Sequence, residues 1–571
     1  MSTRTFEYER VGPAPESPRA EQRMVRMRDG VRLATEVYLP EGDAGREPGP
    51  TVLIRLPYDK DGSYTFIPLI AEHVTARGYR VVAQDVRGKF RSEGETLLFV
   101  NEARDGHDTL AWIEQQEWSD GIVGMWGDSY YGYTQWAAVS SGHPALRAIS
   151  PRVTGTRLGE LPRLAPGAEA MEVEMGVHRL YPVTMFHSND SFHWEVDWSS
   201  RPYIASVERF LEEVGERSIS FDQWWPHPVV LRRFPDGSPF DARPVPVLQT
   251  IGWWDNCAPW QWADHAEIAK RPAWALNEYL LIDSIDHEGY HLARGERVAE
   301  RGEAELRRLV AESLDPTLEF FDVFLRGLAP ADSIPRVRWH LAHAEEELRA
   351  ASSWPPPGVA PLTLVATADG RLAPASEEAP GGLDATGAGA DAGLLRWTHD
   401  PDDLVPSPVG NAFAFLLESP DERAWAQRDD VLVFDGEPVG PEPLDLVGAV
   451  ALDAVAGSDG PAFDLFARLL DVSPDGAAHL IARGQLHVPR ADGEHALRLD
   501  LGQVGYRLRP GHRLRLHVAS SDFPEYMPQP GTGEEPWSAV AVRRNEQTLR
   551  AGARLTLSTL ADNFAEDASA S

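Results

Sequence analysis

A serine stands between glycines in the segment Gly124-Met-Trp-Gly-Asp-Ser-Tyr-Tyr-Gly132, directly after an apolar run and directly before a helical pattern. A strand that turns abruptly into a helix holds the turn residue in a strained conformation and exposes its side chain above the sheet. Small residues at Gly127 and Gly132 let the strand and the helix pass closely. The segment indicates Ser129 as a nucleophile, although its Gly-x-Ser-x-x-Gly spacing, taken alone, also suits a turn with an idle serine.

A nucleophilic serine of this kind needs an acid and a histidine later in the chain, in that order. Asp255 follows the apolar run 245–252, and His287 follows the apolar run that ends at Ile282. The carboxyl ends of parallel strands meet at one edge of a sheet, and ligands bind there. We therefore predict that Ser129, Asp255 and His287 form a catalytic triad that transfers an acyl group through a covalent intermediate.

Other acids and histidines compete for these roles, because the chain has 18 histidines and 88 acidic residues. His291 is the main alternative to His287 as the base. Asp283 and Asp286 are weaker alternatives to Asp255, since they lie too near His287 in sequence to reach it from an independent strand end.

Strand and helix patterns alternate in the segments that carry these residues, which is typical of a parallel sheet covered by helices. We expect strands at 31–39, 51–56, 79–84, 121–126, 146–149, 245–252 and 279–282. We expect helices at 64–77, 102–116, 130–141, 258–270 and 301–326. Short alternating runs after Pro335, separated by Gly, Pro and Asp, predict an antiparallel sandwich or jelly roll.

The fold class is thus α/β with an all-β domain after it. Residues 377–393 are rich in glycine and alanine and are predicted to form a flexible surface loop. The predicted division is a disordered arm at 1–22, an α/β domain at 23–151 and 243–333, an inserted cap at 152–242, a β domain at 334–561 and a flexible tail at 562–571.

Charge and cysteine content restrict the partners. The formal net charge of −34 argues against nucleic acid, whose phosphates need lysine and arginine. Cys257 is the single cysteine, which excludes an intrachain disulfide and a cysteine-rich zinc site. The chemistry needs no cofactor or metal, and we predict neither. With no long apolar run, we expect a cytoplasmic protein without a membrane partner; the oligomeric state stays open, a homo-oligomer included.

The chain resembles the cocaine esterase and X-prolyl dipeptidyl peptidase family of serine hydrolases over nearly all of its length after residue 24. The matching stretches are Met27-Arg-Asp-Gly-Val-Arg32, Pro57-Tyr-Asp-Lys60, Gln84-Asp-Val-Arg-Gly88, Arg91-Ser-Glu-Gly94, Gly124 to Gly132, Ser352-Ser-Trp-Pro-Pro-Pro-Gly358, Arg428-Asp-Asp-Val-Leu432 and Gly511-His-Arg-Leu-Arg-Leu516. Together these stretches are specific, whereas no single one is.

The resemblance implies an α/β-hydrolase domain with an inserted helical cap and a C-terminal jelly roll. It also implies catalytic roles for Ser129, Asp255 and His287. The oxyanion hole would consist of the Tyr58 hydroxyl and the backbone N–H of Tyr130, since a phenol held at the sheet edge can donate to a developing oxyanion.

One stretch departs from the family. The histidine commonly lies in a Gly-Pro-Trp-x-His-Gly-like setting, whereas this chain has Asp283-Ser-Ile-Asp-His-Glu-Gly289. Additional carboxylates beside the imidazole would raise its pKa and shift the pH optimum upward, or they would contact a cationic group of the substrate.

The substrate is less well defined by the sequence. Eight tryptophans cluster between the cap and the acid, and they either line an aromatic pocket or pack the cap; they are Trp194, Trp198, Trp224, Trp225, Trp253, Trp254, Trp260 and Trp262. We expect Trp254, beside Asp255, to be a pocket residue. The leading function is hydrolysis of a small-molecule ester or amide, the substrate being aromatic if the tryptophans line its pocket.

Three further readings remain open. The first is an X-Pro dipeptidyl aminopeptidase or an amino-acid acylase, which would grip a free amine with cap carboxylates such as Glu172, Glu174, Glu195 and Asp197. The second is an acyl transferase, because nothing in the motifs identifies what attacks the acyl-enzyme. The third is a non-catalytic protein whose β domain binds a carbohydrate or a partner, and the complete set of catalytic residue types argues against it.

Overall fold

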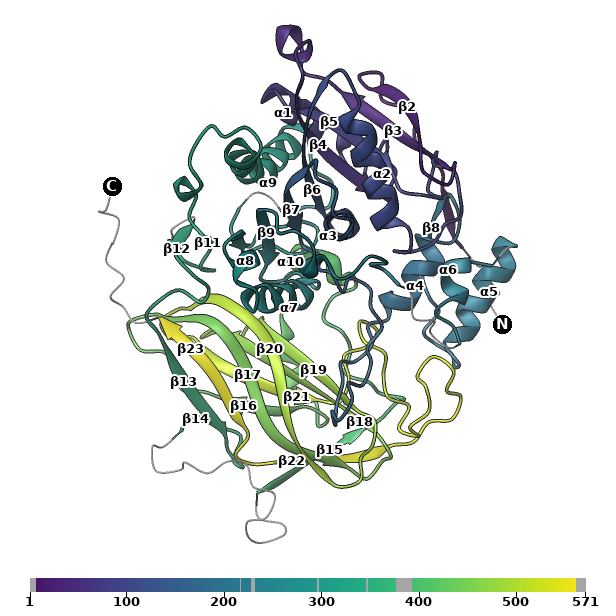
Figure 1. Cartoon of the computed structure of the whole chain (residues 1–571). Coiled ribbons are helices and arrows are strands. Elements are labelled where there is room, and N and C mark those ends of the chain that lie inside the picture. Colours follow the sequence, from purple (N-terminus) through teal and green to yellow (C-terminus); the bar gives the residue numbers. More distant parts are fainter. Residues whose placement is uncertain are drawn as a thin grey trace.

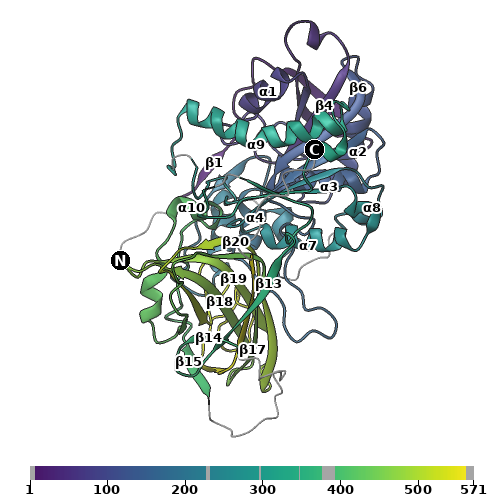
Figure 2. The ribbon, with the colours of Figure 1, turned by 90° about the vertical axis from the view of Figure 1, so that its left-hand side faces the viewer.

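The structure is a computed structural model, and it describes residues 7–215, 217–226, 232–294, 297–345, 348–375 and 393–560. An α/β domain lies above a β domain in Figure 1, and the cap helices lie to one side of the α/β domain. The turned view in Figure 2 shows the same two layers, with helix α9 (Glu303–Phe324) running across the α/β domain below α1 (Ile67–Ala76). The predicted loop at 377–393 and the predicted tail at 562–571 fall, except for Gly393, outside the described residues.

The main sheet has the strand order β12-β11-β10-β9-β7-β6-β4-β5-β3-β2. Neighbours from β11 to β5 pair in parallel, whereas β2, β3 and β12 pair antiparallel at the edges. Its strands are β2 (Glu21–Arg26), β3 (Arg32–Tyr38), β4 (Gly49–Leu56), β5 (Arg80–Asp85), β6 (Ser119–Asp128), β7 (Leu146–Arg152), β9 (Val247–Gly252), β10 (Glu278–Asp283), β11 (Val337–Trp339) and β12 (Arg349–Ala351).

Helices cover both faces of this sheet, which is why its central strands are continuously apolar. In β4, Val52 and Ile54 pack toward α1 (Ile67–Ala76) and α9 (Glu303–Phe324), while Leu53 packs toward α2 and α3 on the other face. The remaining helices are α2 (Glu102–Glu114), α3 (Ser129–Ser140), α4 (Val177–Thr184), α5 (Ile204–Val214), α6 (Ile219–Asp222), α7 (Ala258–Ala269), α8 (Pro272–Ala275) and α10 (Phe415–Glu418). The predicted α/β fold class, a mostly parallel sheet covered by helices, is confirmed.

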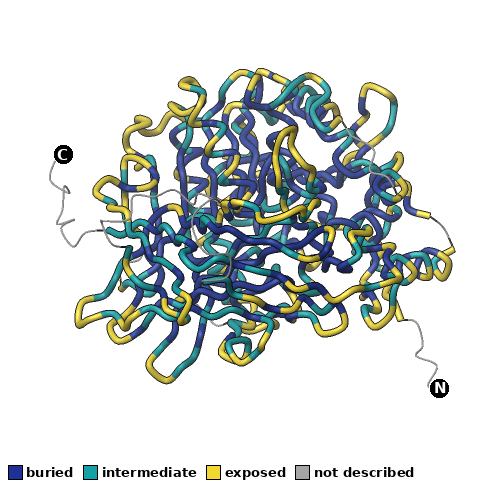
Figure 3. The backbone as a smooth tube through the Cα atoms, turned by 90° about the horizontal axis from the view of Figure 1, so that it is seen from below, coloured by how far each residue is buried: buried dark blue, intermediate teal, exposed yellow. Residues whose placement is uncertain are grey.

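The β domain consists of two antiparallel sheets that share one hydrophobic core, as in a β sandwich. Its strands are β13 (Val359–Ala366), β14 (Leu372–Pro374), β15 (Leu394–His399), β16 (Leu432–Asp435), β17 (Leu444–Ser458), β18 (Phe463–Val472), β19 (Ala478–Val488), β20 (Glu494–Leu508), β21 (Arg513–Ala519), β22 (Asn545–Arg550) and β23 (Arg554–Leu560). Figure 3 shows buried chain through the interior of the molecule and exposed chain at the peripheral loops.

The structure differs from the predicted division at two points. Within the predicted disordered arm, residues 7–22 are described as ordered: β1 (Glu9–Val11) pairs with β8 (Ser191–His193) of the cap, and β2 begins at Glu21. After the predicted start of the β domain at 334, the first two strands, β11 and β12, still extend the main sheet. Proline-rich composition at the arm did not exclude an extended strand that finds its hydrogen-bond partner elsewhere in the chain.

Candidate active site

Ser129 lies at the junction of β6 and α3 and has φ = 52°. This is the left-handed backbone conformation, which residues other than glycine rarely adopt. A Cβ at Gly127 would lie 2.2 Å from Tyr131 Cδ2, and one at Gly132 would lie 2.6 Å from Thr154 Cγ2. Both glycines are therefore required by close packing around the turn. The Ser129 side chain is partly exposed at the carboxyl end of β6.

Asp255 and His287 come from the carboxyl ends of neighbouring strands, β9 and β10. The His287 Nδ1 lies 2.8 Å from Asp255 Oδ1, and the backbone N–H of Cys257 donates to the same oxygen at 3.0 Å. The Asp255 side chain is fully buried, and that of His287 is 8% exposed. The carboxylate is thus placed to fix the orientation of the imidazole.

The pKa of His287 lies well above its ordinary value. Burial lowers this pKa, but the Cys257 sulfur and the hydrogen-bonded Asp255 carboxylate together raise it by more than burial lowers it. The sequence also predicted a raised pKa for His287, but from the acids beside it in sequence, Asp283, Asp286 and Glu288, rather than from Cys257 and Asp255. Of these three acids, Asp286 accepts backbone N–H groups of Tyr290 and Leu416, and Glu288 accepts the Tyr64 hydroxyl.

The alternative base and acid, His291 and Asp283, pair with each other. His291 Nε2 lies 3.0 Å from Asp283 Oδ1, and the Arg294 guanidinium lies 3.4 Å from the other carboxylate oxygen. His340 joins this group, with its Nδ1 at 2.5 Å from Ser284 Oγ. Burial raises the pKa of Asp286 to about 7. These contacts hold the loop after β10 and leave His287 to bond with Asp255.

The β domain also supports the His287 loop. The Glu288 backbone N–H donates to the carbonyl of Phe413 at 3.0 Å, and the Phe413 ring centroid lies 5.0 Å from that of His287. The Leu416 N–H donates to Asp286 Oδ2 at 2.8 Å. Two domains therefore fix the position of the imidazole.

The Tyr58 hydroxyl lies 2.6 Å from the hydroxyl of Tyr181 on the cap helix α4. Burial raises the pKa of Tyr58, against lowering by hydrogen bonds to Tyr181 and Ser129 and by the charge of His287. The phenol thus stays protonated, can donate a hydrogen bond, and lies in one site with Ser129 and His287. Its loop is anchored by Asp85, which accepts the Lys60 N–H at 2.9 Å.

Tyr130 follows Ser129 in the first turn of α3, where backbone N–H groups lack intrahelical acceptors. Its side chain is fully buried and donates to Glu102 Oε1 at 2.9 Å, while Arg55 holds the other carboxylate oxygen at 2.9 Å. The Phe99 N–H donates back to the Tyr130 hydroxyl at 2.9 Å. This buried network fixes the residue whose N–H was predicted to bind the oxyanion.

Trp254 does not have the contacts expected of a pocket residue. Its indole N–H donates to the carbonyl of Leu480 in β19 at 3.1 Å, and its ring packs against Tyr506 in the core of the β domain. We therefore reassign Trp254 from a pocket residue to a residue that packs the α/β domain against the β domain. The reason is that the strand end carrying Asp255 lies directly over the β domain.

The clustered tryptophans separate into several environments. Trp262 stacks with both Trp253 and Trp354 at the domain interface, and the rings of Trp253 and Trp354 are tilted against each other. Trp224 and Trp260, by contrast, belong to a hydrophobic cluster that includes Cys257, Phe186, Tyr181 and Tyr58. We call this cluster the aromatic wall.

The sequence interpretation missed two residues here. Tyr181 lies in a cap helix with no recognisable motif, so only the fold brings its hydroxyl to Tyr58. Cys257 was noted as the single cysteine, and its spacing of two from Asp255 was a usable signal. Among the described residues, two groups place at least three possible metal-ligating atoms within 4.8 Å of one another: Asp255 with Cys257 and His287, and Asp283 with His291 and His340.

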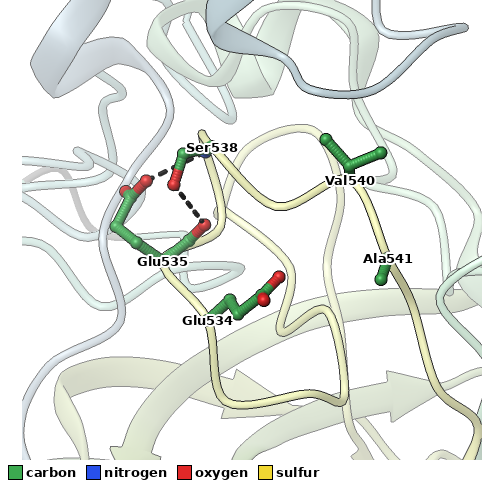
Figure 4. Close-up of a pocket in the computed structure, with 5 residues that line it drawn as sticks. All are labelled: Glu534, Glu535, Ser538, Val540 and Ala541. Atoms are coloured by element: carbon green, nitrogen blue, oxygen red, sulfur yellow. Dashed lines mark hydrogen bonds between the residues drawn. The ribbon is translucent and has the colours of Figure 1, made fainter.

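A separate hollow of about 500 Å³ lies in the loop between β21 and β22 and is lined by Glu534, Glu535, Ser538, Val540 and Ala541 (Figure 4). Ser538 donates its backbone N–H to Glu535 Oε2 at 3.0 Å and its hydroxyl to the Glu535 carbonyl at 3.3 Å. Its lining pairs a serine with carboxylates and no histidine, so Ser129 remains the candidate nucleophile.

Within the described residues, no helix is both long and apolar enough to cross a bilayer.

Family models match most of the chain. Residues 29–289 match the X-Pro dipeptidyl-peptidase (S15 family), and residues 330–556 match the X-Pro dipeptidyl-peptidase C-terminal non-catalytic domain. The cocaine esterase of Rhodococcus sp. (strain MB1 Bresler) is 29% identical over 545 residues, which cover 89% of this chain and 92% of that protein.

Two solved structures share the fold along nearly the whole chain. They are an aminopeptidase from the marine sediment archaeon Thaumarchaeota archaeon, with a TM-score of 0.75, and an α-amino acid ester hydrolase, with a TM-score of 0.74. Each is 22% identical, and the match covers 96% of this chain and 98% of the other. By its sequence matches and its α/β-hydrolase architecture, the chain belongs to the cocaine esterase and X-Pro dipeptidyl peptidase family of serine hydrolases.

Proposed function

We propose that this serine hydrolase cleaves carboxylic esters through an acyl-enzyme. Ser129 attacks the ester carbonyl while His287 takes the hydroxyl proton, and Asp255 stabilises the resulting imidazolium. The C–O bond of the tetrahedral intermediate then breaks as His287 donates the proton to the leaving oxygen, and the alcohol departs. Water then attacks the acyl-enzyme by the same base catalysis and releases the acid.

The observation that carries this proposal is the bond of 2.8 Å between His287 Nδ1 and the buried Asp255. Ser129, in left-handed conformation, and His287 both interact with the Tyr58 hydroxyl. A buried carboxylate on Nδ1 leaves the other imidazole nitrogen to accept a proton. The Tyr58 hydroxyl and the Tyr130 N–H would bind the oxyanion. Their supporting contacts, to Tyr181 and to Glu102, come from different parts of the chain.

Two of the four cap carboxylates, Glu172 and Glu174, lie beside arginines, which favours an ester over the N-terminus of a peptide. A free amine would need an uncommitted carboxylate near the serine. Glu174 bonds to the Arg179 guanidinium through both oxygens, at 2.6 and 3.1 Å, and Glu172 lies 3.5 Å from an Arg157 nitrogen. The aromatic wall instead suits an apolar or aromatic acyl or leaving group.

A panel of substrates tests this function. Purified protein is offered an aryl ester, an α-amino acid ester and a proline dipeptide anilide, with Ser129→Ala as the matched control. We expect the highest kcat/KM for the aryl ester and no turnover by the variant. A higher kcat/KM for the anilide would replace the proposal with the aminopeptidase function.

A further inference from the structure

Three side chains with metal-ligating atoms meet at the candidate site. A tight turn, Asp255-Asn-Cys257, puts a carboxylate and a thiol on the same side, and the Cys257 N–H bonds to Asp255 Oδ1 at 3.0 Å. His287 Nδ1 lies 2.8 Å from that oxygen, and one ligating atom from each residue lies within 4.8 Å of the other two. All three are largely buried.

This donor set matches the preferences of Zn²⁺. Zinc binds Cys, His and carboxylate ligands tetrahedrally, with bonds of about 2.0–2.3 Å, so its ligands lie roughly 3.5 Å apart. Shifts of about 1 Å would bring the present atoms to such spacings. The thiol favours soft cations and disfavours Mg²⁺ and Ca²⁺, which prefer oxygen ligands. A water molecule would complete the coordination.

The group also has unused bonding capacity. Among the described residues, Asp255 Oδ2 is buried and has no hydrogen-bond partner. The second group differs, because Asp283 already faces both His291 and the Arg294 guanidinium. In addition, His291 Nδ1 accepts the Ala293 N–H, so the proton of a neutral imidazole lies on the Nε2 that a metal would need. The carboxylate of the first group thus keeps a free ligating atom, Asp255 Oδ2, whereas both carboxylate oxygens of Asp283 are engaged.

We propose that Asp255, Cys257 and His287 form a binding site for a soft divalent cation of the Zn²⁺ type, and that the bound cation reversibly blocks hydrolysis. Binding releases the thiol proton to solvent, because a coordinating thiol is deprotonated. The ion bonds to the sulfur, to one imidazole nitrogen and to the carboxylate, and no atom is oxidised or reduced.

Blockage follows from the chemistry of imidazole, and this part rests on the proposed function. If the ion takes Nε2, it occupies the lone pair that would accept the serine proton. If it takes Nδ1, the ring proton moves to Nε2, and that nitrogen cannot accept another. Either way His287 is lost as a base, whereas the cation site itself does not depend on the activity.

Cobalt gives a readout that is independent of turnover. Co²⁺ occupies zinc sites of this kind, and a thiolate bound to it absorbs in the ultraviolet by charge transfer. Because Cys257 is the single cysteine, this absorption reports on it alone. We expect Co²⁺ to produce the band in wild-type protein and in neither Cys257→Ala nor Cys257→Ser, whose folding is checked by thermal unfolding.

Inhibition is then measured with an aryl ester. We expect micromolar Zn²⁺ to suppress kcat, EDTA to restore it and Mg²⁺ to have no effect. Relative to its own metal-free rate, Cys257→Ser should need at least about tenfold more Zn²⁺ for half inhibition, the lower end of what losing even an outer-shell partner costs. Absence of the cobalt band, or equal zinc sensitivity of wild type and variant, would overturn the proposal. A cobalt band in a protein without esterase activity would sustain the site and refute the proposed function.

Discussion

Replacing Tyr58 with phenylalanine tests the oxyanion assignment, because it removes one hydroxyl and keeps the ring. The buried phenol stays protonated and is held at 2.6 Å from Tyr181, next to Ser129. Losing one oxyanion donor reduces kcat by roughly 10²–10³, or about 2.7–4 kcal/mol of transition-state stabilisation. The lost hydrogen bond should lower the free energy of unfolding by only about 1 kcal/mol.

Tyr181→Phe is the matched control. It breaks the same hydrogen bond but leaves the Tyr58 hydroxyl, so we expect a similar loss of stability and a much smaller loss of kcat. Steady-state kinetics with an aryl ester and chemical denaturation measure both quantities for each variant. A Tyr58→Phe enzyme with nearly wild-type kcat, or two variants with equal losses of kcat, would refute the oxyanion role.

Three further predictions concern the His287 imidazole and the turn that carries Ser129. His287 must be neutral to act as a base, and its pKa is raised above 6.5; kcat/KM should therefore rise with pH through a limb centred above that value, and a limb at or below 6.5 would contradict this. Asp255→Asn should move the limb to lower pH and reduce kcat by about 10⁴; an unchanged pH profile would dissociate Asp255 from His287. Gly132→Ala should lower the free energy of unfolding by about 1–3 kcal/mol through overpacking. Thr154→Ser removes the methyl group nearest to the new Cβ and should restore part of this loss in the double variant. Purely additive effects of the two substitutions in urea denaturation would argue against the clash.

The elements around the candidate residues could be predicted because each carries a strong local pattern. The apolar runs before Ser129, Asp255 and His287 appear as β6, β9 and β10, and the helical pattern after the serine appears as α3. The carboxyl ends of parallel strands meet at one edge of a sheet, so the shared edge was predictable too. The roles of the three residues remain proposals.

Contacts between distant segments could not be predicted. Nothing near Tyr181 marks its bond to Tyr58, which depends on how the cap folds over the sheet. The burial of Trp254 against Leu480 likewise depends on where the β domain docks. The N-terminal arm has a disorder-like composition, yet β1 is satisfied by a strand about 180 residues away.

The central claim is that Ser129 is the nucleophile, and covalent labelling tests it most directly. Folded protein is treated with a fluorophosphonate probe, digested and mapped by mass spectrometry, with Ser129→Ala treated in parallel. We predict a stoichiometric adduct on Ser129 and none on the variant. A folded wild-type protein that carries no adduct on Ser129, or carries it on another residue, would contradict the claim.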